Sequence, residues 1–146
     1  PEYHLLIAGI GPEEEKVRGI ANSKTNVHYL GYQSKQNTIS LIRGSDLLIQ
    51  PSLMEGTSST LLEAMGCETC IIASNVGGNT ELIENNKTGI LIEPNNAEEL
   101  VDKISYLLIE NEKRSAMATN GLKTVVKYDW KQVGKLYLDI YESLLH

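Results

Sequence analysis

Short apolar runs alternate with longer stretches of helical periodicity along most of the chain. The apolar runs are bounded by Gly, Asn or Pro and lie at residues 3–8, 27–30, 46–50, 70–73 and 89–92. The helical stretches between them lie at residues 13–22, 36–43, 57–66 and 79–85. This alternation is typical of βαβ units with parallel strands. Because the strands are almost continuously apolar, we expect both of their faces to be covered.

After residue 92 the pattern is helical only. Asn96 precedes an acidic first turn, as helix N-caps often do, and apolar residues then recur at helical spacing. Further helices are predicted at residues 112–126 and from residue 129 to the end of the chain. The pattern therefore predicts an α/β fold, with a Rossmann-like parallel sheet flanked by helices and followed by a helical tail.

Composition places the chain among ordinary globular domains. It has 146 residues, 41% of them hydrophobic and 22% charged, and a formal net charge of −6. No internal linker is visible, so we expect one domain over residues 1–146. The chain begins at Pro1 and enters an apolar run almost at once, which suggests a piece cut from a longer protein.

The charge of the chain and its N-terminal sequence bear on its binding partners and its location in the cell. With a pI near 5.1 and no Lys/Arg-rich run, the chain lacks the basic surface that nucleic-acid binding requires. The first apolar run is too short for a signal peptide or a membrane span. We therefore expect a cytoplasmic protein with no nucleic-acid partner.

Gly9 and Gly11 follow the first apolar run and resemble the opening of a dinucleotide-binding loop. The third glycine of such a loop would fall at Glu14, and three consecutive glutamates at the start of the next helix would repel a pyrophosphate. We interpret the two glycines as a tight turn between a strand and a helix.

Cys67 and Cys70 have the spacing of redox and zinc motifs. A zinc site needs four ligands, yet there is no second cysteine pair, and His4, His28 and His146 are far apart in the sequence. A redox motif would open a helix, whereas this pair closes one. We interpret the cysteines as small buried residues at a helix–strand corner and expect no metal site.

Gly77 and Gly78 follow the fourth apolar run. Two glycines permit either a sharp turn or the close approach of a ligand, and local sequence leaves both open. Their place at the carboxyl end of a strand, where α/β sheets bind ligands, favours a ligand-facing loop.

The segment EGTSSTLLEAM, residues 55–65, carries the strongest chemical signal. Small residues precede its helix, so several backbone N–H groups at a helix N-terminus can converge on an anion such as phosphate. Glu63 stands between two apolar pairs, where a carboxylate needs a partner. In one alternative, Thr60 to Glu63 form a capping box, in which Glu63 bonds the N–H of the cap residue. A capping box explains Glu63 but not Glu55.

Glu55 and Glu63, with seven residues between them, resemble the paired glutamates of family 4 glycosyltransferases, whose fold is called GT-B. The likeness covers nearly the whole chain and follows the order of that family's C-terminal, donor-binding domain. The matching segments are Leu6-Ile7-Ala8-Gly9 with Gly11-Pro12, Val27-His28-Tyr29-Leu30-Gly31, Ser45-Asp46 with Gln50-Pro51-Ser52, Glu63-Ala64-Met65, Gly77-Gly78 with Glu81, and Thr88-Gly89-Ile90-Leu91.

This resemblance implies a role for each matching residue. Glu55 resembles the catalytic glutamate that faces the donor sugar, and Glu63 the glutamate that accepts hydrogen bonds from both ribose hydroxyls of a nucleotide-sugar. The remaining donor contacts are implied as backbone groups. The sugar hydroxyls would contact the backbone amides of Gly56, Thr57 and Ser58. The diphosphate would contact the backbone amides of Ser59 and Thr60. The base would contact the loop of Gly31, Tyr32, Gln33 and Ser34.

The implied activity is that of a retaining glycosyltransferase that uses neither metal nor cofactor. It would transfer a sugar from a UDP- or GDP-sugar to a glycan, lipid or other acceptor held by an N-terminal domain absent from this chain. The full-length enzyme would be cytoplasmic and peripherally associated with the inner face of the membrane, and this chain alone would be inactive.

Two departures from the family pattern stand out. Glu68 and Cys70 replace the usual Gly and Pro. The family's diphosphate-clamping Arg and Lys lie on a strand and loop before the point where this chain starts, and Lys16 and Arg18 lie in a different helix. Two other functions remain open: a sugar-nucleotide epimerase of GT-B architecture, and a module that binds a nucleotide-sugar without catalysis.

Overall fold

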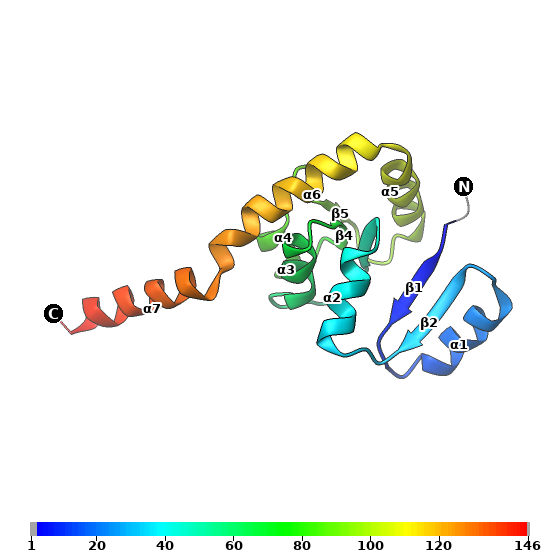
Figure 1. Ribbon diagram of the computed structural model, residues 1–146, viewed down its shortest axis with the longest axis horizontal. Coiled ribbons are helices and arrows are strands. Elements are labelled where there is room, and N and C mark those ends of the chain that lie inside the picture. Colours follow the sequence, from blue (N-terminus) through cyan, green and yellow to red (C-terminus); the bar gives the residue numbers. More distant parts are fainter. Residues whose placement is uncertain (1–2, 146) are drawn as a thin grey trace. The chain divides into compact units, whose positions relative to one another are not determined.

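A computed structural model describes residues 3–145, so Pro1, Glu2 and His146, which the single-domain prediction includes, lie outside the described residues. The chain divides into two compact units, Pro1–Leu41 and Ile42–His146. Figure 1 shows the order of the elements along the chain. A single domain over residues 1–146 stays a prediction.

The first unit contains β1 (Leu5–Ala8), α1 (Glu14–Ser23), β2 (Val27–Gly31) and most of α2 (Lys35–Arg43). Strands β1 and β2 are parallel, with Leu5 opposite Val27, and the register shifts between Ile7 and Ala8. Leu5 and Leu6 remain 46% and 43% exposed. Within this unit the sheet has two strands and helix α1 packs chiefly against β2; coverage of both faces of β1 stays a prediction.

The second unit contains a three-stranded parallel sheet in the order β3-β4-β5. Its elements up to the last strand are β3 (Leu47–Gln50), α3 (Ser59–Gly66), β4 (Cys70–Ser74), α4 (Asn79–Leu82) and β5 (Ile90–Ile92). The helical tail comprises α5 (Ala97–Ile109), α6 (Asn111–Val125), the short 3₁₀ helix η1 (Val126–Tyr128) and α7 (Trp130–Leu144). Parallel sheets flanked by helices, with a helical tail, confirm the predicted fold class.

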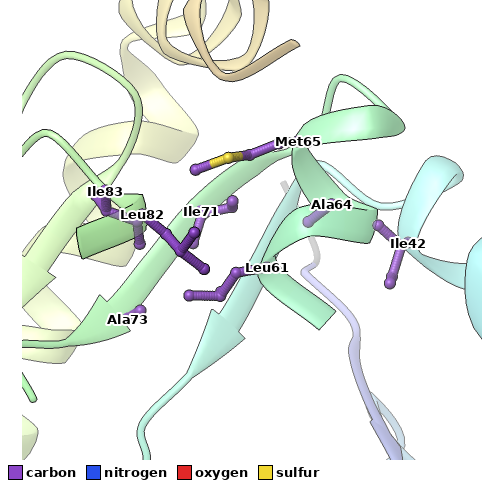
Figure 2. Packing of buried hydrophobic residues seen from close by; sticks show 8 residues of the cluster. All are labelled: Ile42, Leu61, Ala64, Met65, Ile71, Ala73, Leu82 and Ile83. Carbon is purple, nitrogen blue, oxygen red and sulfur yellow. The ribbon is translucent and has the colours of Figure 1, made fainter. Parts of the chain in front are cut away.

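Strand β4 is buried along its whole length and organises the core of the second unit. Side chains alternate across a strand, so Ile71 and Ala73 join one apolar cluster while Cys70 and Ile72 join another. Figure 2 shows the first cluster, in which three residues of α3 pack against the strand: Leu61, Ala64 and Met65. All three are fully buried, and this packing anchors α3 against β4.

Helix α6 completes this packing by contacting both α3 and β4. A Cβ added at Gly121 of α6 would lie 3.3 Å from the Met65 Cγ atom, so the two helices approach closely there. Within residues 3–145 no helix is long and apolar enough to cross a membrane.

Candidate functional site

Two loops meet at the carboxyl edge of the second sheet. The first follows β3 and leads into α3, and the second follows β4 and leads into α4. Because β3 and β4 are adjacent and parallel, both loops emerge from the same edge. The Gly78 amide of the second loop donates a hydrogen bond of 3.2 Å to the Glu55 carbonyl of the first.

This contact explains the paired glycines. A Cβ atom at Gly77 would lie 2.1 Å from the Glu55 carbonyl oxygen, and one at Gly78 would lie 2.1 Å from the Gly56 carbonyl oxygen. Gly77 also has a φ of +39°, which L-residues rarely adopt. Both positions therefore need glycine because the backbone of the first loop leaves no room for a side chain. In contrast, a Cβ at Gly56 would meet no atom within 4 Å.

The Glu55 carboxylate is half-buried and held by two side chains. Its Oε2 atom accepts hydrogen bonds from Gln50 Nε2 at 2.9 Å and from Ser52 Oγ at 3.2 Å. Both of these side-chain bonds use the same carboxylate oxygen. No role for Gln50 or Ser52 was predicted from the sequence. The available signal was a single glutamine that ends the otherwise apolar strand LLIQ before a proline.

Ser58 is the N-cap of α3, and this corrects the capping-box alternative. The Ser58 Oγ atom accepts a hydrogen bond of 3.4 Å from the Leu61 amide, so Leu61 is the third helical residue. In the alternative, Thr60 would be the cap and Glu63 the third residue, but the helix begins at Ser59. A capping box needs Glu at the third position, so Glu63 cannot complete one.

Glu63 lies on the flank of α3. It is half-buried, whereas Leu61 and Ala64 beside it are fully buried. Its predicted role at the ribose stays a prediction, as does the sugar-facing role of Glu55.

The amides that were predicted to bind an anion lie in the first turn of α3, and their binding of an anion stays a prediction. Ser59 and Thr60 are the first two residues of the helix, so their N–H groups have no carbonyl acceptor within it. Gly56, Thr57 and Ser59 are exposed, whereas Ser58 is buried by its capping role. Ser59 is thus exposed and Thr60 half-buried at the positive end of the helix dipole.

The predicted base-binding loop belongs to the first unit. Gly31 has a φ of +63°, which explains the need for glycine at this turn. Gln33 Nε2 donates to the Leu30 carbonyl at 2.7 Å, and Ser34 Oγ accepts from the Asn37 amide at 3.2 Å. Tyr32 is 75% exposed. These bonds give the loop a defined conformation, and its contact with a base stays a prediction.

The Gly9 turn and the two cysteines, which were interpreted as structural from the sequence, lie at the ends of strands and helices. Gly9 has a φ of +135°, and its amide donates to the Gly31 carbonyl at 2.8 Å, as expected of a turn that follows a strand. Cys67 ends α3 and is half-buried, while Cys70 begins β4 and is buried. Burial raises the pKa of the Cys70 thiol to about 11. Among residues 3–145, no group of three or more His, Cys, Asp or Glu side chains could hold a metal ion.

Helix α1 carries two cationic side chains, Lys16 and Arg18, and Arg18 contacts an aromatic ring. Its guanidinium bonds Glu14 at 2.8 Å and lies 4.8 Å from the centroid of the Tyr29 ring. Lys16 pairs with Glu13 at 3.1 Å. Both cations are thus engaged within the first unit.

Known proteins match this chain in sequence and in fold. Residues 1–124 match the family model described as glycosyl transferases group 1. An N,N'-diacetylbacillosaminyl-diphospho-undecaprenol alpha-1,3-N-acetylgalactosaminyltransferase of Campylobacter jejuni is 33% identical over 119 residues, which are 82% of this chain and 31% of that protein.

Two solved structures illustrate the likeness in fold. A glycosyltransferase from Rickettsia africae is 26% identical, with a TM-score of 0.86 over 98% of this chain and 40% of that one. HepE of Anabaena, crystallised with UDP-glucose, is 22% identical, with a TM-score of 0.77 over 94% of this chain and 41% of that one.

The chain therefore spans less than half the length of each of these proteins. Its strands, helices and tail nevertheless have the arrangement of a GT-B glycosyltransferase. Because the family model matches most of its residues, the chain belongs to the glycosyl transferases group 1 family.

Proposed function

We propose that this chain is the donor-binding part of a retaining glycosyltransferase of family 4. The full-length protein would transfer a sugar from a nucleotide-sugar to a glycan, lipid or other acceptor held by an N-terminal domain. Membership of the family supports the reaction class. UDP-glucose bound to HepE, which shares the fold, supports a UDP-sugar as a donor, and a GDP-sugar is the other candidate.

One observation carries the proposal: the Glu55 carboxylate and the N-terminus of α3 belong to the same ordered segment. Ser58 caps the helix and shares the Gln50 amide with Glu55. A donor whose sugar contacts Glu55 could therefore direct its diphosphate toward the amides of Ser59 and Thr60.

The proposed chemistry is departure of the leaving group. Negative charge grows on the diphosphate as the bond between the sugar and its oxygen breaks, and amides at a helix N-terminus are already oriented to stabilise that charge. Glu55 would contact the sugar as its ring approaches an oxocarbenium-like state.

Glu63 would hold the ribose. Two adjacent hydroxyls can donate to one carboxylate, and charge-assisted hydrogen bonds of this kind are stronger than neutral ones. Half-burial suits this role, since it limits competition by water while leaving part of the side chain accessible.

The resemblance to family 4 also supports a reaction without metal or cofactor, in a cytoplasmic enzyme at the inner face of the membrane. Transfer by the full-length protein should accordingly survive EDTA. The isolated chain should bind nucleotide with a Kd of about 0.1 mM or weaker and should not transfer sugar, because the acceptor domain is absent.

The test is a panel of UDP- and GDP-sugars applied to the full-length protein, with binding measured by thermal shift and products by mass spectrometry. We expect one donor to raise the melting temperature and to yield a glycosylated acceptor with the anomeric configuration of the donor. Binding without any product would favour a sensing module, and an epimerised nucleotide-sugar would favour an epimerase. An inverted product would contradict the retaining mechanism.

A further inference from the structure

Gln50 joins two parts of the candidate site through one side-chain amide. It is the last residue of β3 and lies opposite Ala73 of the buried strand β4. Gln50 Nε2 donates to Glu55 Oε2 at 2.9 Å and to Ser58 Oγ at 2.9 Å. Ser58 Oγ also donates to Gln50 Oε1 at 3.1 Å. The glutamine therefore bonds both the carboxylate and the N-cap of α3.

These bonds define the orientation of the amide. An NH₂ group has two hydrogens, and Glu55 and Ser58 accept one each. Rotating the amide by half a turn would place its oxygen against a carboxylate, which accepts only, and would replace an attractive contact with a repulsive one. The observed orientation is therefore the one that the carboxylate selects.

The same bonds orient Glu55. Gln50 and Ser52 both bond Oε2, from the end of the strand and from the loop respectively. Two donors on one oxygen limit the rotation of the carboxylate. Ser58 links this arrangement to α3, because its Oγ atom also accepts the Leu61 amide.

We propose that Gln50 is a positioning residue for glycosyl transfer, which sets the orientation of the Glu55 carboxylate relative to the first turn of α3. This inference rests on the proposed function. Gln50 acts through Glu55, so its loss should reduce turnover while leaving binding of the bare nucleoside diphosphate nearly intact.

The primary test is Gln50→Met in the full-length enzyme, since methionine has a similar length and lacks the amide. We expect kcat for the nucleotide-sugar to fall about 10- to 100-fold, as expected when a reacting geometry is loosened. The Kd of the nucleoside diphosphate should change less than about threefold. An unchanged kcat would overturn the proposal, and so would an equal loss of kcat and of diphosphate affinity.

Thr69→Val is the matched control. Thr69 is buried in the same unit, and its Oγ1 atom donates to the Ile42 carbonyl at 2.9 Å. This variant also loses a hydrogen bond, so it should lower the melting temperature while keeping wild-type kcat at a temperature where both proteins are folded. If Thr69→Val reduced kcat as much as Gln50→Met, general destabilisation would replace positioning as the explanation.

A double mutant tests whether Gln50 acts through Glu55. If it does, Gln50→Met combined with Glu55→Ala should be no slower than Glu55→Ala alone, because the carboxylate to be positioned is already gone. If the reductions in kcat of the two single variants instead multiplied in the double variant, the inference would be contradicted.

A crystal structure of the Gln50→Met variant separates this inference from the proposed function. The Glu55 carboxylate should rotate away from its wild-type orientation even if no donor in the panel is transferred. An unchanged carboxylate would overturn the positioning role, whereas a wild-type protein that neither binds nor transfers any nucleotide-sugar would overturn the proposed function alone.

Discussion

The Gly78 amide donates a hydrogen bond of 3.2 Å to the Glu55 carbonyl, so the loop after β4 supports the loop that carries the candidate catalytic carboxylate. The two glycines at residues 77 and 78 permit this approach, since a Cβ on either would overlap a carbonyl oxygen at 2.1 Å. The conformation around Glu55 thus depends on a contact between two loops.

Gly78→Ala should displace the loop around Glu55. The overlap is with backbone, which cannot move aside as a flexible side chain can, so we expect a loss of about 1–3 kcal/mol in the free energy of unfolding and weaker donor binding. Chemical denaturation and donor titration measure the two effects. Gly134→Ala is the control: its Cβ would meet nothing within 4 Å inside helix α7, so this variant should be slightly more stable. Equal stability of the two variants would refute the close approach.

Gly56→Ala separates a ligand contact from a protein contact. A Cβ at Gly56 has open space around it, so stability should change by less than about 0.5 kcal/mol. If the sugar approaches this backbone, affinity for the nucleotide-sugar should fall, whereas affinity for the nucleoside diphosphate should hold. Calorimetric titration with both ligands provides the comparison, and undiminished affinity for the nucleotide-sugar would place the sugar elsewhere.

Glu63→Gln should weaken donor binding without affecting the fold. Glutamine keeps the length and a side-chain oxygen acceptor of Glu63, so we expect a nearly unchanged melting temperature. Loss of the charge shared by two ribose hydroxyls should reduce donor affinity by about 1.5–3 kcal/mol. Glu112→Gln, at an exposed position of α6, should change neither property. A lower melting temperature with full donor affinity would assign Glu63 a structural role.

Glu55→Ala should act on the chemical step. In the full-length enzyme we expect kcat to fall on the order of 10²-fold or more, while affinity for the bare nucleoside diphosphate stays nearly unchanged. The decisive comparison titrates nucleoside diphosphate and nucleotide-sugar on wild type and mutant side by side. Equal losses for both ligands would place Glu55 at the nucleotide, and an unchanged kcat would remove it from the mechanism.

Cys70 should make stability fall at alkaline pH. Burial raises the pKa of its thiol to about 11 from an ordinary value of 9.0, so the folded state holds the proton more tightly than the unfolded state. The resulting stabilisation is complete below pH 9 and is lost as the pH rises toward 11, by about 2–3 kcal/mol. Urea unfolding across this range measures the loss, and at pH 8 alkylation mapped by mass spectrometry should modify Cys67 before Cys70. Rapid alkylation of Cys70 in the folded protein would contradict its burial.

The hydrophobic pattern by itself determined the order and type of the strands and helices, because local periodicity reports which face of an element avoids water. The two glutamates and the small residues before α3 could also be identified from the sequence, because they lie within one short segment of the chain. The short helix after Gly78 was predicted too long, ending at residue 85 instead of Leu82, because a few polar residues do not define where a helix stops.

Tertiary structure alone decided which residue caps α3, what the paired glycines touch and what holds Glu55. Ser58 and Thr60 are both good caps by local preference, and in the structure Ser58 Oγ accepts hydrogen bonds from the Leu61 amide and from Gln50 at the end of the preceding strand. The contact of Gly78 with Glu55 joins residues that are far apart in the sequence, and the bonds of Gln50 arise because a strand end and a helix start meet at one edge of the sheet. Such contacts depend on how distant segments pack in space, and periodicity along the chain carries no information about them.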